Sequence, residues 1–212
     1  MTSIIYLLVN LLAVVLGGLS MFFLLRKSHV EKWASFGITF LICIVAVMFG
    51  CSLDLKLSER IAEIHFDSLR AVSGIGIVLI ISYFAFRKYF EAILRAVILS
   101  SPLMYGLAKI GCAVAGCCHG IEYSGSLNMH GYFPIQPVET VVFLGIYLLG
   151  LKTKSVNVVV YVSLGAKFLL DFLRADRGGI ISRNQILILV YLAIWSVVAI
   201  CEHRKRICKS ST

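Results

Sequence analysis

Seven apolar stretches, each close to the length needed to cross a bilayer, constrain this chain more than any other feature. They cover residues 4–25, 34–52, 70–86, 93–116, 136–151, 157–174 and 184–202. A helix that spans the hydrocarbon core needs about 20 apolar residues. Lipid offers no hydrogen bonds to the backbone, so such stretches predict helices. We therefore expect one all-α, polytopic transmembrane domain over residues 1–212 with seven transmembrane helices.

The composition agrees with a membrane protein. Hydrophobic residues make up 59% of the chain and charged residues 15%, and the mean hydropathy is +0.93. A soluble domain of ordinary surface area could not bury this many apolar side chains. The first apolar stretch has no preceding Lys or Arg and no small-residue cleavage site at its end. It therefore predicts a permanent helix rather than a cleaved signal peptide.

The lysines and arginines predict the orientation. When the loops are assigned alternately to two sides, twelve of the twenty basic residues fall on one side and six on the other. The positive-inside rule then places the N-terminus outside and the C-terminus in the cytoplasm. The net charge of +9 is mainly this topology signal. Basic blocks such as residues 204–206 are anchors on anionic lipid, and no nucleic-acid partner is expected.

Two polar loops, about 53–69 and 119–135, fall on the outer side in this topology. Any chemistry outside the membrane is expected there. The first loop also predicts a short amphipathic helix at the interface, with Leu53, Leu57, Ile61 and Ile64 on its apolar face.

Three ionisable side chains, Lys109, Glu139 and Lys167, lie deep within the apolar stretches. Each is 13 or 14 residues from the basic residue that marks the cytoplasmic end of its helix: Arg95, Lys152 and Lys154, respectively. At ~1.5 Å per residue, all three lie about 20 Å from the cytoplasmic edge. An ionisable group at such a depth is costly unless it is paired or faces a cavity. These residues therefore mark a candidate functional site.

A charged row on the 157–174 stretch extends this site, because Lys167, Asp171 and Arg174 recur at the spacing of one helical face. Two interpretations stay open. The charges are either internal ion pairs, Lys109 with Glu139 and Lys167 with Asp171, or the lining of a polar cavity open to the outer leaflet. The cavity is favoured because desolvation cancels most of the Coulomb gain of buried pairs. Its cations suit the phosphodiester of a phospholipid headgroup.

The segment around Lys109 resembles the signature of the prolipoprotein diacylglyceryl transferases. Residues 102–120 read Pro-Leu-Met-Tyr-Gly-Leu-Ala-Lys-Ile-Gly-Cys-Ala-Val-Ala-Gly-Cys-Cys-His-Gly, against a family pattern of G-R-x-G-x-F-x-x-G-x-x-x-G. The matching glycines are Gly111, Gly116 and Gly120. We also expect Gly116 and Gly120 to terminate the helix beside the site.

Two further segments match family patterns in the same order. Residues 134–139 read Pro-Ile-Gln-Pro-Val-Glu and are similar to P-x-Q-x-x-E. Residues 167–174 are similar to R-F-x-x-E-x-x-R, and residues 182–185 are similar to S-x-x-Q. The resemblance covers roughly residues 70–200, and seven spans with an external N-terminus agree with the family.

The resemblance implies a multi-pass enzyme of the bacterial plasma membrane. It would move a diacylglyceryl group from phosphatidylglycerol to the lipobox cysteine of a prolipoprotein signal peptide and release glycerol phosphate, with membrane lipids as surroundings and no cofactor. Catalytic roles are implied for Lys109, Glu139, Lys167 and Asp171. Substrate contacts are implied for Gly111, Gly116, Gly120, Gln136, Arg174, Ser182, Gln185 and His119.

Several positions depart from the family pattern. Lys109 and Lys167 stand where the family has arginine, Asp171 replaces glutamate, and residues 71–74 (Ala-Val-Ser-Gly) replace a His-Gly-Gly or Tyr-Gly-Gly run. Lysine keeps the positive charge but lacks the planar guanidinium group with which arginine binds a phosphate through two hydrogen bonds. Two alternatives therefore stay open, a related lipid transferase with another acceptor and a non-catalytic phospholipid-binding membrane protein.

Attack by a thiol is helped by a base. The candidates are Glu139, ranked first by its motif position, and the loop residues His119 and His130. Among the seven cysteines, Cys112, Cys117 and Cys118 adjoin His119. Metal sites usually draw ligands from two separated segments and one helix end cannot wrap an ion, so we expect no metal. A disulfide or reactive thiol at Cys117 or Cys118 stays open.

Overall fold

The computed structural model describes residues 2–56, 61–66, 68–126, 129, 131–175 and 179–210. This part of the chain folds into a helical bundle with the following α-helices: α1 (Thr2–Lys27), α2 (Lys32–Gly50), α3 (Ser68–Ala85), α4 (Phe90–Ala115), α5 (Ile135–Thr153), α6 (Val156–Leu170) and α7 (Arg183–Ser210). A short 3₁₀ helix, η1 (Asp171–Leu173), continues α6. Each α-helix overlaps one of the apolar stretches, although α6 ends before residue 174 and α7 continues beyond residue 202.

Six of these helices are long and apolar enough to cross a membrane, namely α1, α2, α4, α5, α6 with η1, and α7. The apolar part of α3, Arg70–Ala85, is shorter. Large apolar side chains cover the outside of the bundle, such as Phe23 at 66% and Phe84 at 77% exposure. Lipid rather than water suits such a surface. The chain is therefore a helical, multi-pass membrane protein.

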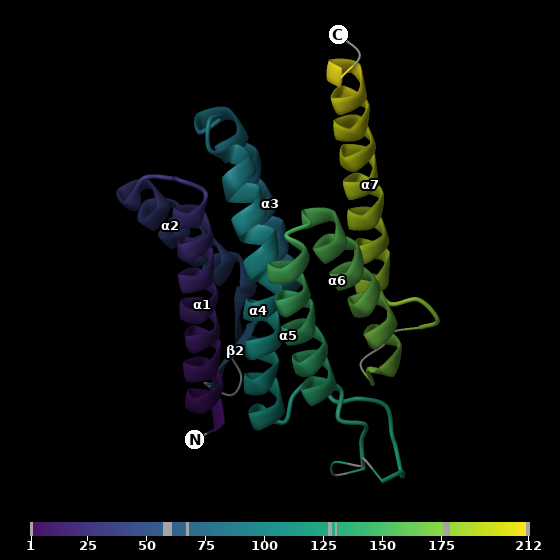
Figure 1. Cartoon of the computed structure of the whole chain (residues 1–212). Coiled ribbons are helices and arrows are strands. Elements are labelled where there is room, and N and C mark those ends of the chain that lie inside the picture. Colours follow the sequence, from purple (N-terminus) through teal and green to yellow (C-terminus); the bar gives the residue numbers. More distant parts are fainter. Residues whose placement is uncertain are drawn as a thin grey trace.

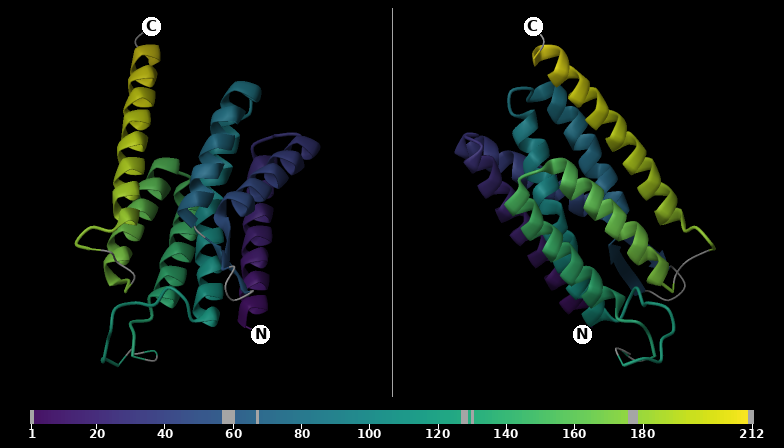
Figure 2. Two further views of the ribbon diagram at one scale, coloured as in Figure 1. Left: turned by 180° about the vertical axis from the view of Figure 1, so that it is seen from behind. Right: turned by 45° about the vertical axis from the view of Figure 1, so that its right-hand side comes forward.

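α4 is the central helix of the bundle. It packs against α1 on one side and α5 on the other, while α6 packs on α5 and α7 on α6. α2 and α3 pack against each other, and these arrangements can be followed in Figure 1. Figures 1 and 2 show that α1 begins at the end of the bundle opposite to the end where α7 finishes.

Glycines allow α4 to approach its two neighbours closely. A Cβ atom on Gly106 would lie 3.3 Å from the carbonyl oxygen of Thr140 in α5. A Cβ atom on Gly111 would lie 3.1 Å from Nδ2 of Asn10 in α1. Small residues at such contacts let membrane helices pack tightly. The structure thus places Gly111 in the contact between α4 and α1.

A β-hairpin lies between α2 and α3, so the amphipathic helix expected in this loop is wrong. Strands β1 (Cys51–Lys56) and β2 (Ile61–Phe66) pair antiparallel. Apolar and polar residues alternate through much of both segments. This period of two suits a strand, whereas an amphipathic helix needs a period near 3.6.

Candidate functional site

Lys109, Glu139 and Lys167 meet inside the bundle, each on a different helix. Nζ of Lys109 lies 2.9 Å from Oε2 of Glu139, and Nζ of Lys167 lies 2.7 Å from Oε1. Lys167 is aligned as a hydrogen-bond donor, whereas the Lys109 contact is an ion pair without that alignment. All three residues are buried, and Glu139 has no exposed surface. One carboxylate therefore joins α4, α5 and α6 at a single depth.

The sequence predicted that these three residues share a layer. In the ion-pair interpretation that it left open, the pairing of Lys109 with Glu139 is confirmed and that of Lys167 with Asp171 is wrong. Lys167 pairs with Glu139 rather than with Asp171. The reason is that α6 ends at Leu170, and Asp171 begins the tighter 3₁₀ turn η1. The row expected along one continuous α-helical face is broken at that point.

Tyr105 completes the cluster and was not singled out from the sequence. Its hydroxyl donates a hydrogen bond of 2.8 Å to Oε1 of Glu139. The Nζ atoms of Lys109 and Lys167 lie 5.1 and 5.2 Å from the centre of its ring, within cation–π range. Tyr105 precedes Lys109 by four residues on α4, which places both on one helical face. The four-residue spacing from Lys109 is therefore the sequence signal that could have identified Tyr105.

A second charged group lies where η1 ends. Nε of Arg174 is 3.9 Å from Oδ1 of Asp171, and both residues are buried. The Ser182 hydroxyl donates a hydrogen bond to Oδ2 of the same carboxylate. Asp171 thus connects Arg174 to the segment that opens α7.

Ser182 and Gln185 form a capping box at the start of α7. The Gln185 backbone N–H donates to Oγ of Ser182 at 3.1 Å, and the Ser182 backbone N–H donates to Oε1 of Gln185 at 2.9 Å. Such reciprocal bonds satisfy N–H groups that a helix start leaves without partners. Gln185 also donates through Nε2 to the carbonyl of Phe168. The S-x-x-Q pattern therefore anchors α7 to α6 and η1.

The chain turns back at the end of α4. Gly116 adopts a left-handed conformation with φ of 66°, and the Cys117 backbone N–H bonds to the Cys112 carbonyl at 3.1 Å. This is a Schellman cap, as the helix-terminating glycine predicted. Cys118 is also left-handed, with φ of 58°. Nε2 of Gln136 donates a 2.6 Å bond to the Cys117 carbonyl, which ties the turn to α5.

Gly120 places this turn beside Arg174. The Ile121 backbone N–H bonds to the Leu173 carbonyl at 2.9 Å, and Gly120 forms a bridge with Arg174. A Cβ atom on Gly120 would collide with the Phe133 carbonyl oxygen. His119 is exposed in the same turn, next to the ring of Tyr132. The other loop candidate for a base, His130, lies outside the described residues.

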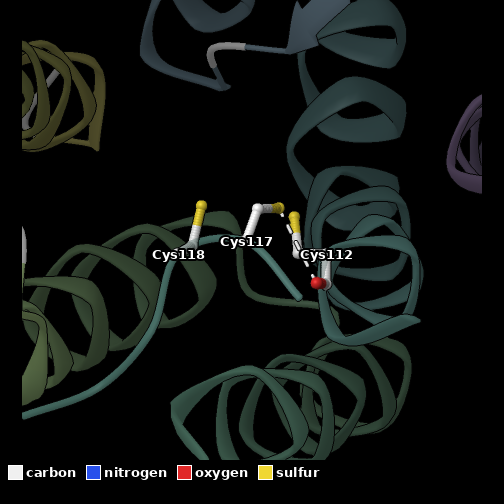
Figure 3. A group of neighbouring side chains, drawn as sticks. All are labelled: Cys112, Cys117 and Cys118. Atoms are coloured by element: carbon white, nitrogen blue, oxygen red, sulfur yellow. Dashed lines mark hydrogen bonds between the residues drawn. The ribbon is translucent and has the colours of Figure 1, made fainter. Parts of the chain in front are cut away.

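Three thiols gather at this turn. The Sγ atoms of Cys112, Cys117 and Cys118 all lie within 4.8 Å of one another, and Figure 3 shows the Cys117 side chain between the other two. The Cys117 thiol donates a 3.7 Å hydrogen bond to the Cys112 carbonyl. Interactions with the neighbouring Cys112 and Cys117 thiols lower the pKa of the Cys118 thiol. The positive charges of Lys109 and Arg174 act in the same direction. The three thiols therefore lie near both sets of charged residues, the one with Lys109 and the one with Arg174.

No family model, curated protein or solved structure matches the chain. The resemblance carried by the motifs around Lys109, Glu139 and Lys167 therefore stays a prediction.

Proposed function

We propose that this chain is a bacterial plasma-membrane transferase that moves a diacylglyceryl group from phosphatidylglycerol to the lipobox cysteine of a prolipoprotein. The observation that carries the proposal is the buried cluster of two ammonium groups around one carboxylate. Lys109, Glu139 and Lys167 also occupy the positions of charged residues in the resembled motifs.

The transfer would form a bond between the acceptor sulfur and a glyceryl carbon while the bond from that carbon to a phosphate oxygen breaks. The departing glycerol phosphate takes the electron pair and needs positive charge beside it. Lys109 and Lys167 carry two positive charges against the single negative charge of Glu139. This excess inside a low-dielectric bundle favours an anion at the same depth. The phosphate of phosphatidylglycerol is such an anion.

Glu139 fits a positioning role better than the role of base. Its carboxylate is fully buried and holds Lys109, Lys167 and the Tyr105 hydroxyl. To accept a proton it would have to release an ammonium group that the departing phosphate needs. We therefore assign Glu139 to holding the lysines, and the acceptor thiol needs another route to its thiolate.

The proposal includes seven spans, with α3 as the short seventh, an external N-terminus and a cytoplasmic C-terminus. The opposite placement of the start of α1 and the end of α7 supports an odd number of crossings. The turn at residues 116–120 would then face the outside, where lipoprotein precursors emerge. Reporter fusions after α7 should be active on the cytoplasmic side, and activity on the outer side would contradict this topology.

The activity can be tested directly with purified protein in vesicles that contain phosphatidylglycerol and a lipobox peptide. We expect a diacylglyceryl mass gain on the peptide cysteine. Lys109→Ala and Lys167→Ala should each slow the transfer by roughly 100-fold or more, as does the loss of one charge-stabilising group in other enzymes. Lys152→Ala is the matched control, because Lys152 is an exposed lysine at the end of α5.

The remaining outcomes separate the alternatives. A mass gain on a different peptide or thiol, with none on the lipobox peptide, would favour a related transferase with another acceptor. Saturable binding of phosphatidylglycerol without any transfer would favour a non-catalytic lipid-binding protein. If both lysine variants transfer at the normal rate, the cluster is structural.

A further inference from the structure

The thiols of Cys112, Cys117 and Cys118 are close enough to share one metal ion. Zinc binds thiolate sulfur at about 2.3 Å in a tetrahedron, which places the sulfurs about 3.8 Å apart. The three Sγ atoms already lie within 4.8 Å of one another. An inward shift of about 1 Å or less per pair would therefore bring them to zinc distances.

The backbone of the turn at residues 116–118 supplies the chain reversal that a straight helix end lacks. The left-handed residues Gly116 and Cys118 reverse the chain, so that the side chains of Cys117 and Cys118 come beside that of Cys112. Left-handed backbone is unfavourable for a non-glycine residue and is retained where surrounding contacts impose it. The bond from Gln136 to the Cys117 carbonyl is one such contact. The residue type at position 118 does not indicate this reversal. The sequence therefore suggested a single helix end, which cannot wrap an ion, and predicted no metal.

The surroundings suit the charge of a metal–thiolate group. Three thiolates around Zn²⁺ leave one net negative charge. Lys109 lies three residues before Cys112 on α4, and Gly120 pairs with Arg174 immediately beyond the turn. Positive charge on both sides offsets the negative charge of the group. Cys117 and Cys118 are half-buried, so part of their surface is accessible.

We infer that Cys112, Cys117 and Cys118 bind one Zn²⁺ ion and leave its fourth coordination position open to an external thiol. Three protein ligands with one open position are the arrangement of catalytic zinc sites. A thiol that enters this position binds as a thiolate and releases its proton to solvent, with no change of oxidation state. If the proposed transfer holds, on which this last step rests, the entering thiol is that of the lipobox cysteine.

Zinc binding is tested on the full-length protein in detergent, reduced with a phosphine and stripped with a chelator. Titration with Zn²⁺ against a chromophoric competitor should give one ion per chain. Cys112→Ser, Cys117→Ser and Cys118→Ser should each weaken binding by more than about 100-fold, beyond the effect of losing a supporting residue around a metal. Cys43→Ser is the control, because Cys43 lies on α2. No stoichiometric binding by the reduced protein would overturn the site, as would binding retained in the triple variant.

The Cys118→Gly variant distinguishes loss of zinc binding from loss of folding. Glycine adopts the left-handed conformation of residue 118 without strain, so this variant should melt no lower than the metal-free parent. It should nevertheless lose zinc. A Cys118→Gly protein that still binds one ion as tightly as the parent would show that Cys118 is not a ligand.

The open position is tested with Co²⁺ in place of Zn²⁺. A lipobox peptide should change the thiolate-to-cobalt absorption, and the same peptide with serine for cysteine should not. An unchanged spectrum with the cysteine peptide would overturn the open position. Normal transfer by the zinc-free protein would overturn the role in thiol activation and leave the proposed function intact. Stoichiometric zinc and thiol binding without transfer would overturn the proposed function and leave the site intact.

Discussion

Glu139→Gln removes the carboxylate that two buried ammonium groups share. At 2.7 and 2.9 Å, each pair has a Coulomb attraction of roughly 6 kcal/mol at an effective dielectric constant of 20. Desolvation offsets most of that attraction in the intact cluster. Without the carboxylate, Lys109 and Lys167 keep their desolvation cost and also repel each other. We therefore expect a loss of about 3–5 kcal/mol in the free energy of unfolding.

Lys109→Met is the informative comparison, because it removes a charge from the same cluster without unbalancing it. Glu139 would still hold Lys167 and the Tyr105 hydroxyl, one cation for one anion. Methionine has a similar length and packs well in apolar surroundings. We expect a loss of roughly 1 kcal/mol, the common value for a point substitution. Lipid transfer should nevertheless be lost, since the departing phosphate needs the ammonium group.

Thermal unfolding in detergent distinguishes these two variants. For a chain of this size, 1 kcal/mol corresponds to about 2–4 °C in Tm. Glu139→Gln should therefore melt roughly 6–20 °C below the parent and Lys109→Met roughly 2–4 °C below it. Equal shifts for both variants, or a Glu139→Gln protein that melts with the parent, would refute the account of a shared carboxylate.

Substitutions at three further positions, with Gly145 as a control, test neighbouring features by the same melting assay. Gly120→Ala should destabilise the protein because its Cβ meets a backbone carbonyl, whereas Gly145→Ala, which meets nothing within 4 Å, should not lower Tm; equal shifts would contradict this. Ser182→Ala should cost about 2 kcal/mol, since the start of α7 loses its cap and Asp171 loses a donor. Tyr105→Phe should cost about 1 kcal/mol by removing the hydrogen bond to the shared carboxylate, and Tyr105→Leu should cost more because the ring beneath both ammonium groups is lost as well.

The positions of the helices follow from hydropathy, because the backbone in lipid has few alternatives to a helix. The shared layer of Lys109, Glu139 and Lys167 follows as well, since basic residues at the helix ends fix the register of three consecutive antiparallel helices. The choice of partner for Lys167 does not follow. It depends on where α6 changes to a 3₁₀ turn, and the residues around Leu170 carry no sequence signal for the end of a helix.

Features that depend on backbone reversal were the hardest to predict. Glycine at position 116 indicated the end of α4, but the left-handed conformation of Cys118 has no signal in its residue type. The three thiols come together only because both Gly116 and Cys118 are left-handed. Tyr105 was accessible in principle from its spacing to Lys109. Ser182 and Gln185 have the spacing of a capping box, and the same spacing also fits the substrate contacts that the resemblance implied.

The shared carboxylate has a consequence for the biogenesis of this protein. α4, α5 and α6 carry one buried charged side chain each. Inserting each helix alone into the bilayer would cost about 2.5–3.5 kcal/mol because of that charge. This free-energy cost falls once Glu139 pairs with Lys109 and Lys167. We therefore expect α4 to stay at the insertion machinery until α5 and α6 have been synthesised. The three helices would then leave for the lipid together.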